Sequence, residues 1–206
     1  MPRNAIVYNK TSHSSSVSQP TSMLSFLRLL KQRYEQVLEF SKGLDQTHRQ
    51  NFRRITRTLA FTEAYLEKAE IFARHPEMPT HIAVLGPTQS GKSSVINWLL
   101  QDEAAEMSPL AGYTVHPQGF SIGDDPHRYE GLAGYFRNYA RCHRRELNHG
   151  QLDSYSLDEI PVSAATSSLK GTMIWDSPDF DSVESEGYRD AVLRTAALAD
   201  IIILVI

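Results

Sequence analysis

A phosphate-binding loop is the clearest chemical signal in the sequence. Residues 86–93 read Gly-Pro-Thr-Gln-Ser-Gly-Lys-Ser and match G-x-x-x-x-G-K-[ST] at every fixed position. The glycines allow successive backbone N–H groups to turn inward around an anion, and the lysine adds a positive charge. The final hydroxyl suits Mg²⁺, which prefers oxygen ligands. The motif predicts that a nucleotide's phosphates contact Gly86, Pro87, Thr88, Gln89, Ser90, Gly91, Lys92, Ser93 and the adjacent Ser94.

The segments around this loop have the character that the motif requires. Residues 81–85 form a short apolar run that predicts a strand, and residues 93–100 have helix character. The positive end of that helix would add to the anion site. A second apolar run at 172–175 ends at Asp176. An aspartate at the end of a strand beside the loop strand is where a Mg²⁺-binding carboxylate belongs, so we expect Asp176 and Ser93 to hold the ion.

The remaining pattern after residue 80 alternates strands with helices. We expect a strand at 119–122, mostly helix over Arg128–Leu147, a helix over Glu184–Ala199 and a buried strand at Asp200–Ile206. Such alternation predicts an α/β domain over 81–206 with a mainly parallel sheet. The stretch at about 124–170 is interpreted as an insertion.

The N-terminal part predicts a flexible tail at 1–21 and an α-helical hairpin at 22–76. The tail is rich in serine and threonine and poor in apolar residues. Gly43 interrupts the helical pattern, and Asp45 is suited to cap the second helix. Apolar residues recur at helical spacing and predict one face of each helix: Met23, Leu27, Leu30, Tyr34 and Val37, then Phe52, Ile55, Leu59 and Leu66.

Composition predicts a soluble, cytoplasmic protein with two unlike modules. Of 206 residues, 41% are hydrophobic and 22% charged, which is typical of globular proteins. Residues 1–80 carry 12 Lys and Arg against 7 Asp and Glu, whereas residues 81–206 carry 9 against 17. The basic helices 22–75 could serve self-association or a protein partner, or touch membrane or RNA, although a solvated face is the simpler interpretation. The single Cys142 excludes an intrachain disulfide, and no secretory signal is visible.

Residues 81–206 resemble the translation-factor-related class of P-loop GTPases, particularly its Era-like and dynamin-like branches. The resemblance is carried by Gly86–Ser94 and by Asp176-Ser177-Pro178-Asp179, where the family has Asp-Thr/Ser-Pro-Gly. It implies GTP as the ligand and Mg²⁺ as the cofactor. It also implies that Asp176 holds the metal, that Thr114 closes over Mg²⁺ and the γ-phosphate, and that the N–H of Asp179 contacts that phosphate.

Several positions depart from the family pattern. Asp179 replaces the glycine and brings a carboxylate toward the γ-phosphate, a repulsion of about 4 kcal/mol at ~4 Å in a medium of dielectric ~20. Phe180 stands where many small GTPases have a water-orienting glutamine, so hydrolysis is expected to be slow. The remaining catalytic candidates are Thr88, Gln89 and Thr114. The inserted helix would also present arginines to an acidic surface or a phosphate, or simply to solvent: Arg137, Arg141, Arg144 and Arg145.

Three functions stay open from the sequence. A GTP-binding switch is favoured, a P-loop ATPase is the second, and a non-hydrolysing nucleotide-binding scaffold is the third. The family reads guanine through Asn/Thr-Lys-x-Asp after the strand represented by Asp200–Ile206, and this motif is absent from the sequence. Because the sequence stops within an apolar strand, we expect a fragment of a longer protein, poorly stable and weak in nucleotide binding by itself.

Overall fold

The structure is a computed structural model that describes residues 19–40, 43, 45–105, 114–126, 129–148, 150–179 and 186–206. Phe180, Arg128 and most of the predicted tail lie outside the described residues.

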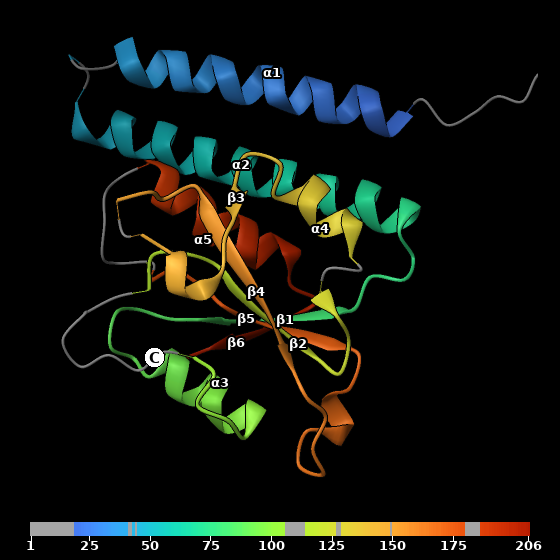
Figure 1. Cartoon of the computed structure of the whole chain (residues 1–206). Helices are drawn as coiled ribbons and strands as arrows, with labels where there is room; N and C mark the ends of the chain where they lie inside the picture. Colours follow the sequence, from blue (N-terminus) through green and yellow to red (C-terminus); the bar gives the residue numbers. More distant parts are fainter. Residues whose placement is uncertain are drawn as a thin grey trace, which may run out of the picture.

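The predicted α/β fold is confirmed. A six-stranded sheet has the order β3-β4-β2-β5-β1-β6 (Figure 1). All neighbouring strands are parallel except β2 and β5, which are antiparallel. The strands span Thr80–Leu85 (β1), Gln118–Ile122 (β2), Ala140–Arg141 (β3), Ser154–Ile160 (β4), Thr172–Asp176 (β5) and Ile201–Leu204 (β6).

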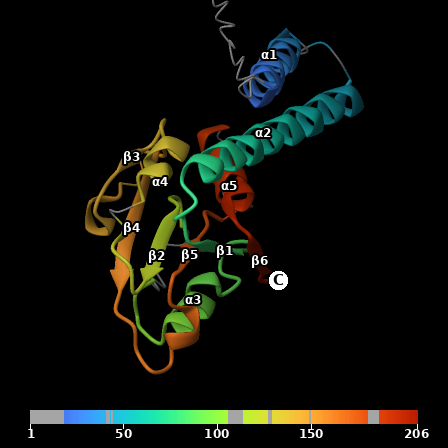
Figure 2. The same cartoon turned by 90° about the vertical axis from the view of Figure 1, so that its right-hand side faces the viewer.

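Helices cover both faces of this sheet (Figures 1 and 2). One face packs against α3 (Lys92–Leu100), and the other against α4 (Glu130–Tyr135) and α5 (Glu186–Leu198). The long α2 (Gln46–Arg74) lies over α4 and α5, and α1 (Gln19–Phe40) lies outermost on α2. None of the described helices combines the length and apolar character that a bilayer crossing requires.

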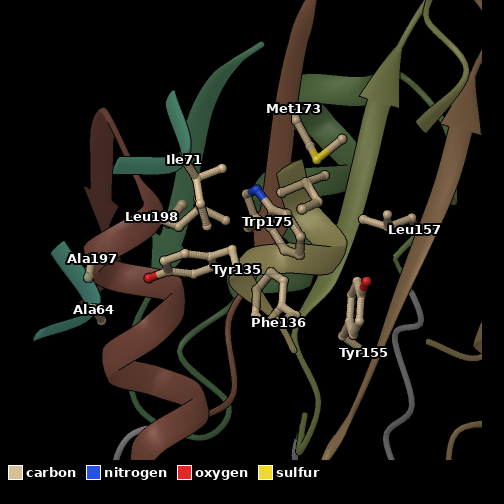
Figure 3. Packing of buried hydrophobic residues seen from close by; sticks show 12 residues of the cluster. Ala64, Ile71, Tyr135, Phe136, Tyr155, Leu157, Met173, Trp175, Ala197 and Leu198 are labelled. Carbon is tan, nitrogen blue, oxygen red and sulfur yellow. The ribbon is translucent and has the colours of Figure 1, made fainter. Parts of the chain in front are cut away.

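Alternating side chains of the strands build a separate core on each face. In β5, Ile174 points to the α3 side, whereas Met173 and Trp175 point to the side of α2, α4 and α5. Trp175 is fully buried at the centre of the core on the side of α2, α4 and α5 (Figure 3). Its ring lies 5.4 Å from that of Phe136, which stacks at 4.6 Å on Tyr155. This two-residue alternation is the pattern of a sheet covered on both faces.

The helical hairpin is present, and the stripe predicted on α1 is buried in part. Asp45 caps α2 as predicted, because its side chain accepts a hydrogen bond from the His48 N–H at 3.0 Å. Leu27, Leu30 and Tyr34 are half-buried, and the Tyr34 ring lies 6.0 Å from that of Phe52 in α2. Met23 and Val37, at the two ends of the stripe, are 58% and 43% exposed, whereas Leu24 is buried. Apolar residues occur on both sides of α1, so spacing alone did not determine which side α2 covers. The helix also begins at Gln19, earlier than predicted, because Pro20 fits a first helical turn.

The prediction of a mostly helical Arg128–Leu147 is wrong. Only Glu130–Tyr135 is α-helical, and the chain then forms β3 and a 3₁₀ turn at Arg144–Glu146. Gly131 lowers helix propensity, and it lets α4 approach α2 because an added Cβ would lie 2.9 Å from Ile71. The arginines therefore do not share a helix: one lies in a turn, one on β3 and two in the 3₁₀ turn (Arg137, Arg141, Arg144 and Arg145). The middle segment also contains β4, which was not predicted, and β3 and β4 extend the sheet beyond β2.

The predicted final strand is present as β6, and three of its four side chains are exposed rather than buried. Ile201, Ile202 and Leu204 are 51%, 50% and 61% exposed. β6 is the edge strand next to β1, and it pairs with β1 through Ile82–Leu85. Among the described residues no element covers the outer edge of β6.

A cluster of charged side chains centred on a buried carboxylate joins the hairpin to the sheet domain. We call it the Glu67 cluster, and it consists of Glu67, Arg28, Arg137 and Arg194. Glu67 of α2 accepts hydrogen bonds from Arg28 of α1 at 2.5 Å, from Arg137 after α4 at 2.7 Å and from Arg194 of α5 at 3.0 Å. Glu67 and Arg194 are each 6% exposed. One carboxylate thus holds three separate elements together.

His81 on β1 predicts a loss of stability at mildly acidic pH. It is fully buried, and its Nδ1 accepts a hydrogen bond from Trp175 Nε1 at 2.9 Å. Burial lowers the pKa of His81 to about 3, against 6.5 when unperturbed. Below pH 6.5 the unfolded chain therefore binds a proton that the folded chain excludes, and stability falls until about pH 3. Between pH 6.5 and 5 we expect His81 alone to contribute a loss of about 1–2 kcal/mol. The buried Asp176, whose pKa is raised to about 7, contributes in the opposite direction over the same range.

Urea unfolding of the native protein and of His81→Gln at pH 6.5 and 5 measures this loss. On going from pH 6.5 to 5, the change in the free energy of unfolding should be about 1–2 kcal/mol more favourable in the variant than in the native protein, because only the native protein carries the His81 contribution. An equal decrease in both proteins would contradict the assignment to His81.

Candidate functional site

The loop between β1 and α3 has the curved backbone that an anion site requires. Gly91, at the N-terminus of α3, and Gln89 both adopt left-handed conformations, with φ of 95° and 59°. Ser90 N–H donates to Pro87 O at 3.3 Å, which closes a tight turn. Left-handed residues that alternate with others direct successive N–H groups to one side of the chain. The predicted phosphate loop is therefore built at the N-terminus of α3.

Only glycine fits at position 86 of this loop. A Cβ there would lie 2.5 Å from Ser90 Oγ and 2.7 Å from Val205 O, and the backbone oxygen cannot move aside as a side chain can. We expect Gly86→Ala to lower the free energy of unfolding by about 1–3 kcal/mol and to weaken nucleotide binding through the distorted loop.

Gly134→Ala is the matched control for that substitution. Gly134 lies in α4, and the nearest atom to an added Cβ is Ile71 Cδ1 at 3.9 Å, an ordinary contact. Alanine favours a helix over glycine, so this variant should keep or slightly raise the melting temperature. Equal melting temperatures for Gly86→Ala and the native protein would contradict the steric argument.

Lys92 is buried and already holds two oxygen acceptors. Its ammonium donates to Pro87 O at 2.9 Å and to the carboxylate of Asp179. The residues are 4% and 2% exposed. The sequence analysis assigned to Asp179 a role for its backbone N–H, and that N–H donates to Thr114 O at 3.0 Å. The contact between its side chain and Lys92 was missed.

Ser93 and Asp176, which were predicted to hold Mg²⁺, are brought together as a hydrogen-bonded pair. The register of β1 and β5 places Asp176 beside Val84, next to the start of the loop. Ser93 Oγ donates to Asp176 Oδ2 at 2.9 Å, while Oδ1 is buried and has no hydrogen-bond partner within the described part of the chain. Burial raises the pKa of Asp176 to about 7, and Ser93 and Lys92 oppose that shift. A buried carboxylate with a spare oxygen beside a serine hydroxyl fits Mg²⁺.

The main chain of Thr114 contacts Asp179, which binds Lys92. Its carbonyl oxygen accepts hydrogen bonds from Asp179 N–H at 3.0 Å and from the hydroxyl of Tyr188 in α5 at 2.8 Å. Tyr188 was missed, because its position on the buried face of α5 gave no signal of this contact. The structure places Thr88 in the loop and Gln89 on its exposed side. Catalytic roles for Thr88, Gln89 and Thr114, and metal binding by Thr114, stay predictions.

Comparison with known families agrees with this geometry. Residues 81–206 match the family model described as 50S ribosome-binding GTPase. The chain belongs to this GTPase family. Membership confirms a P-loop GTPase domain and supports a guanine nucleotide as its ligand, in preference to the ATPase alternative. No curated protein matches the chain.

The GTPase domain and the hairpin meet at β1. The match begins at His81, one residue into that strand, and α1 and α2 precede it in the chain. The GTPase domain thus includes the whole sheet with α3, α4 and α5, including the strands β3 and β4 that the sequence analysis did not predict.

Proposed function

We propose that this GTPase-family chain is a Mg²⁺-dependent guanine-nucleotide switch. The nucleotide's phosphates would lie on residues 86–93, and Mg²⁺ would be held by Ser93 and Asp176. The observation that carries the proposal is the hydrogen-bonded pair Ser93–Asp176 with its spare buried oxygen, next to Lys92 at the start of α3.

Bound Mg²⁺ would neutralise phosphate charge, which is its usual role at such sites. The chain's own part is to present oxygen ligands in a fixed geometry. Asp176 is held by the pairing of β5 with β1, and Ser93 by the first turn of α3. Burial raises the pKa of Asp176, and a divalent ion would favour its charged form.

A physical connection from the phosphate site to the hairpin supports the switch. Asp179 and Tyr188 meet at the carbonyl oxygen of Thr114. Tyr188 belongs to α5, which carries Arg194 further along, and Arg194 contacts Glu67 of α2. A movement of residues 114 and 179 on nucleotide exchange would therefore act on α5 and on the hairpin. We propose the hairpin as the output or assembly element.

Slow hydrolysis of GTP is part of this proposal, and a non-hydrolysing binder is the second candidate. The contact of Asp179 with Lys92 favours the second, because it places a negative charge at the residue that should face the γ-phosphate. A time course of phosphate release with excess GTP separates them. Release above the background of Lys92→Ala supports hydrolysis, and equal rates support the binder.

Mg²⁺ dependence of binding tests the proposed ligand and metal together. GDP and ADP are titrated into the full chain by calorimetry, with Mg²⁺ or with EDTA. We expect GDP to bind more tightly than ADP, Mg²⁺ to strengthen binding by about tenfold or more, and Asp176→Asn to abolish that gain. Asp102→Asn, which removes a charge from an exposed position after α3, is the control. Affinities that EDTA does not change would contradict the metal site.

A further inference from the structure

The carboxylate of Asp179 occupies the partner position that a phosphate would take on Lys92. The two side chains are 3% and 4% exposed, so their charges meet away from solvent. The lysine of this motif ordinarily reaches the β- and γ-phosphates. In this chain the same ammonium is already neutralised by an anion from its own sequence, 87 residues away.

This arrangement affects diphosphates and triphosphates differently. A diphosphate would accept hydrogen bonds from the loop N–H groups and would contact Lys92 only through its β-phosphate. The carboxylate of Asp179 could then stay bound to the same ammonium. A triphosphate brings further negative charge to the same ammonium. It must either displace Asp179 or bind against its repulsion, which is strong where water is excluded.

We infer that Asp179 is a specificity-determining residue, an internal substitute for the terminal phosphate that biases the site toward GDP and against GTP. This inference rests on the proposed nucleotide site and deepens it. The protein would bind GDP in preference to GTP, and the side chain of Asp179 would cause this preference.

Displacement of Asp179 also has a structural consequence. The backbone N–H of Asp179 donates to Thr114 O. Movement of the Asp179 carboxylate away from Lys92 would therefore strain this hydrogen bond. Tyr188 shares the same carbonyl oxygen. Binding of a triphosphate would thus be linked to rearrangement at Thr114, whereas binding of a diphosphate would leave it intact.

The experiment compares affinities for GDP and for a non-hydrolysable GTP analogue, measured by calorimetry with Mg²⁺ on the full chain. The variants are Asp179→Asn, which keeps the size and removes the charge, and Asp179→Gly, which keeps only the backbone N–H. Asp102→Asn is the control for loss of one exposed carboxylate. Thermal unfolding of each protein verifies that it is folded. If one of the two Asp179 variants does not fold, the other still tests the inference.

The native protein should prefer GDP by about tenfold or more, and both Asp179 variants should reduce that preference by about tenfold. Asp102→Asn should leave it unchanged. If both nucleotides bind and the preference is the same with and without the Asp179 carboxylate, the inference is overturned while the proposed function stands. If neither nucleotide binds the native protein, both are overturned.

Discussion

Lys92→Met is expected to lower nucleotide affinity by about tenfold to a hundredfold, because the buried cation that faces the phosphates is lost. It is also expected to lower the free energy of unfolding by about 3–5 kcal/mol, because it leaves the carboxylate of Asp179 buried without its countercharge. Calorimetry with GDP and urea unfolding without nucleotide measure the two effects separately.

The double variant Lys92→Met, Asp179→Asn separates binding from stability. With both charges removed, no uncompensated ion remains in the site, so most of the lost stability should return. Nucleotide affinity should stay low, because the cation is still missing. If the double variant is as unstable as Lys92→Met alone, the two side chains do not form the buried pair described here.

Glu67→Gln should lower the free energy of unfolding by about 3 kcal/mol, because it leaves the buried Arg194 without one of its countercharges. Arg194 keeps Asp190 at 3.1 Å and the carbonyl oxygen of Tyr135 at 3.0 Å, which places the loss at the lower end for a broken buried pair. The hairpin should also separate more readily from α5, seen as faster hydrogen exchange in α2.

Arg137→Met is the control, because it removes another partner of the same carboxylate from a side chain that is 49% exposed. Exposed ion pairs contribute little, so this change should cost less than about 1 kcal/mol. Equal losses for Glu67→Gln and Arg137→Met would show that burial does not decide the strength of the Glu67 cluster.

The sequence predicted those parts of the site that depend on local pattern. The loop at 86–93, the strand before it and the helix after it are contiguous, so spacing and hydrophobicity determine them. Asp176 could be placed beside Ser93 because parallel strands of this fold bring their carboxyl ends together. The hydrogen bond between the two side chains agrees with that placement.

Long-range contacts and short strands could not be read in the same way. β3 has two residues and gains its shape from pairing with β4. Gly131 weakens the helix that composition suggested, and it lies so close to α2 that an added Cβ would be 2.9 Å from Ile71. The partner of Lys92 lies 87 residues away, and no local pattern reveals it. Tertiary packing therefore determines the structure of the middle segment and the pairing of Lys92 with Asp179.

The most direct test of the phosphate site is a ¹H–¹⁵N correlation spectrum of the full chain, recorded with and without GDP and Mg²⁺. We expect the backbone N–H signals of residues 89–93 to shift most, and we expect Lys92→Met to need about tenfold to a hundredfold more GDP for the same shifts. Shifts confined to other parts of the molecule, with the signals of 89–93 unchanged, would contradict the claim that this loop binds the nucleotide.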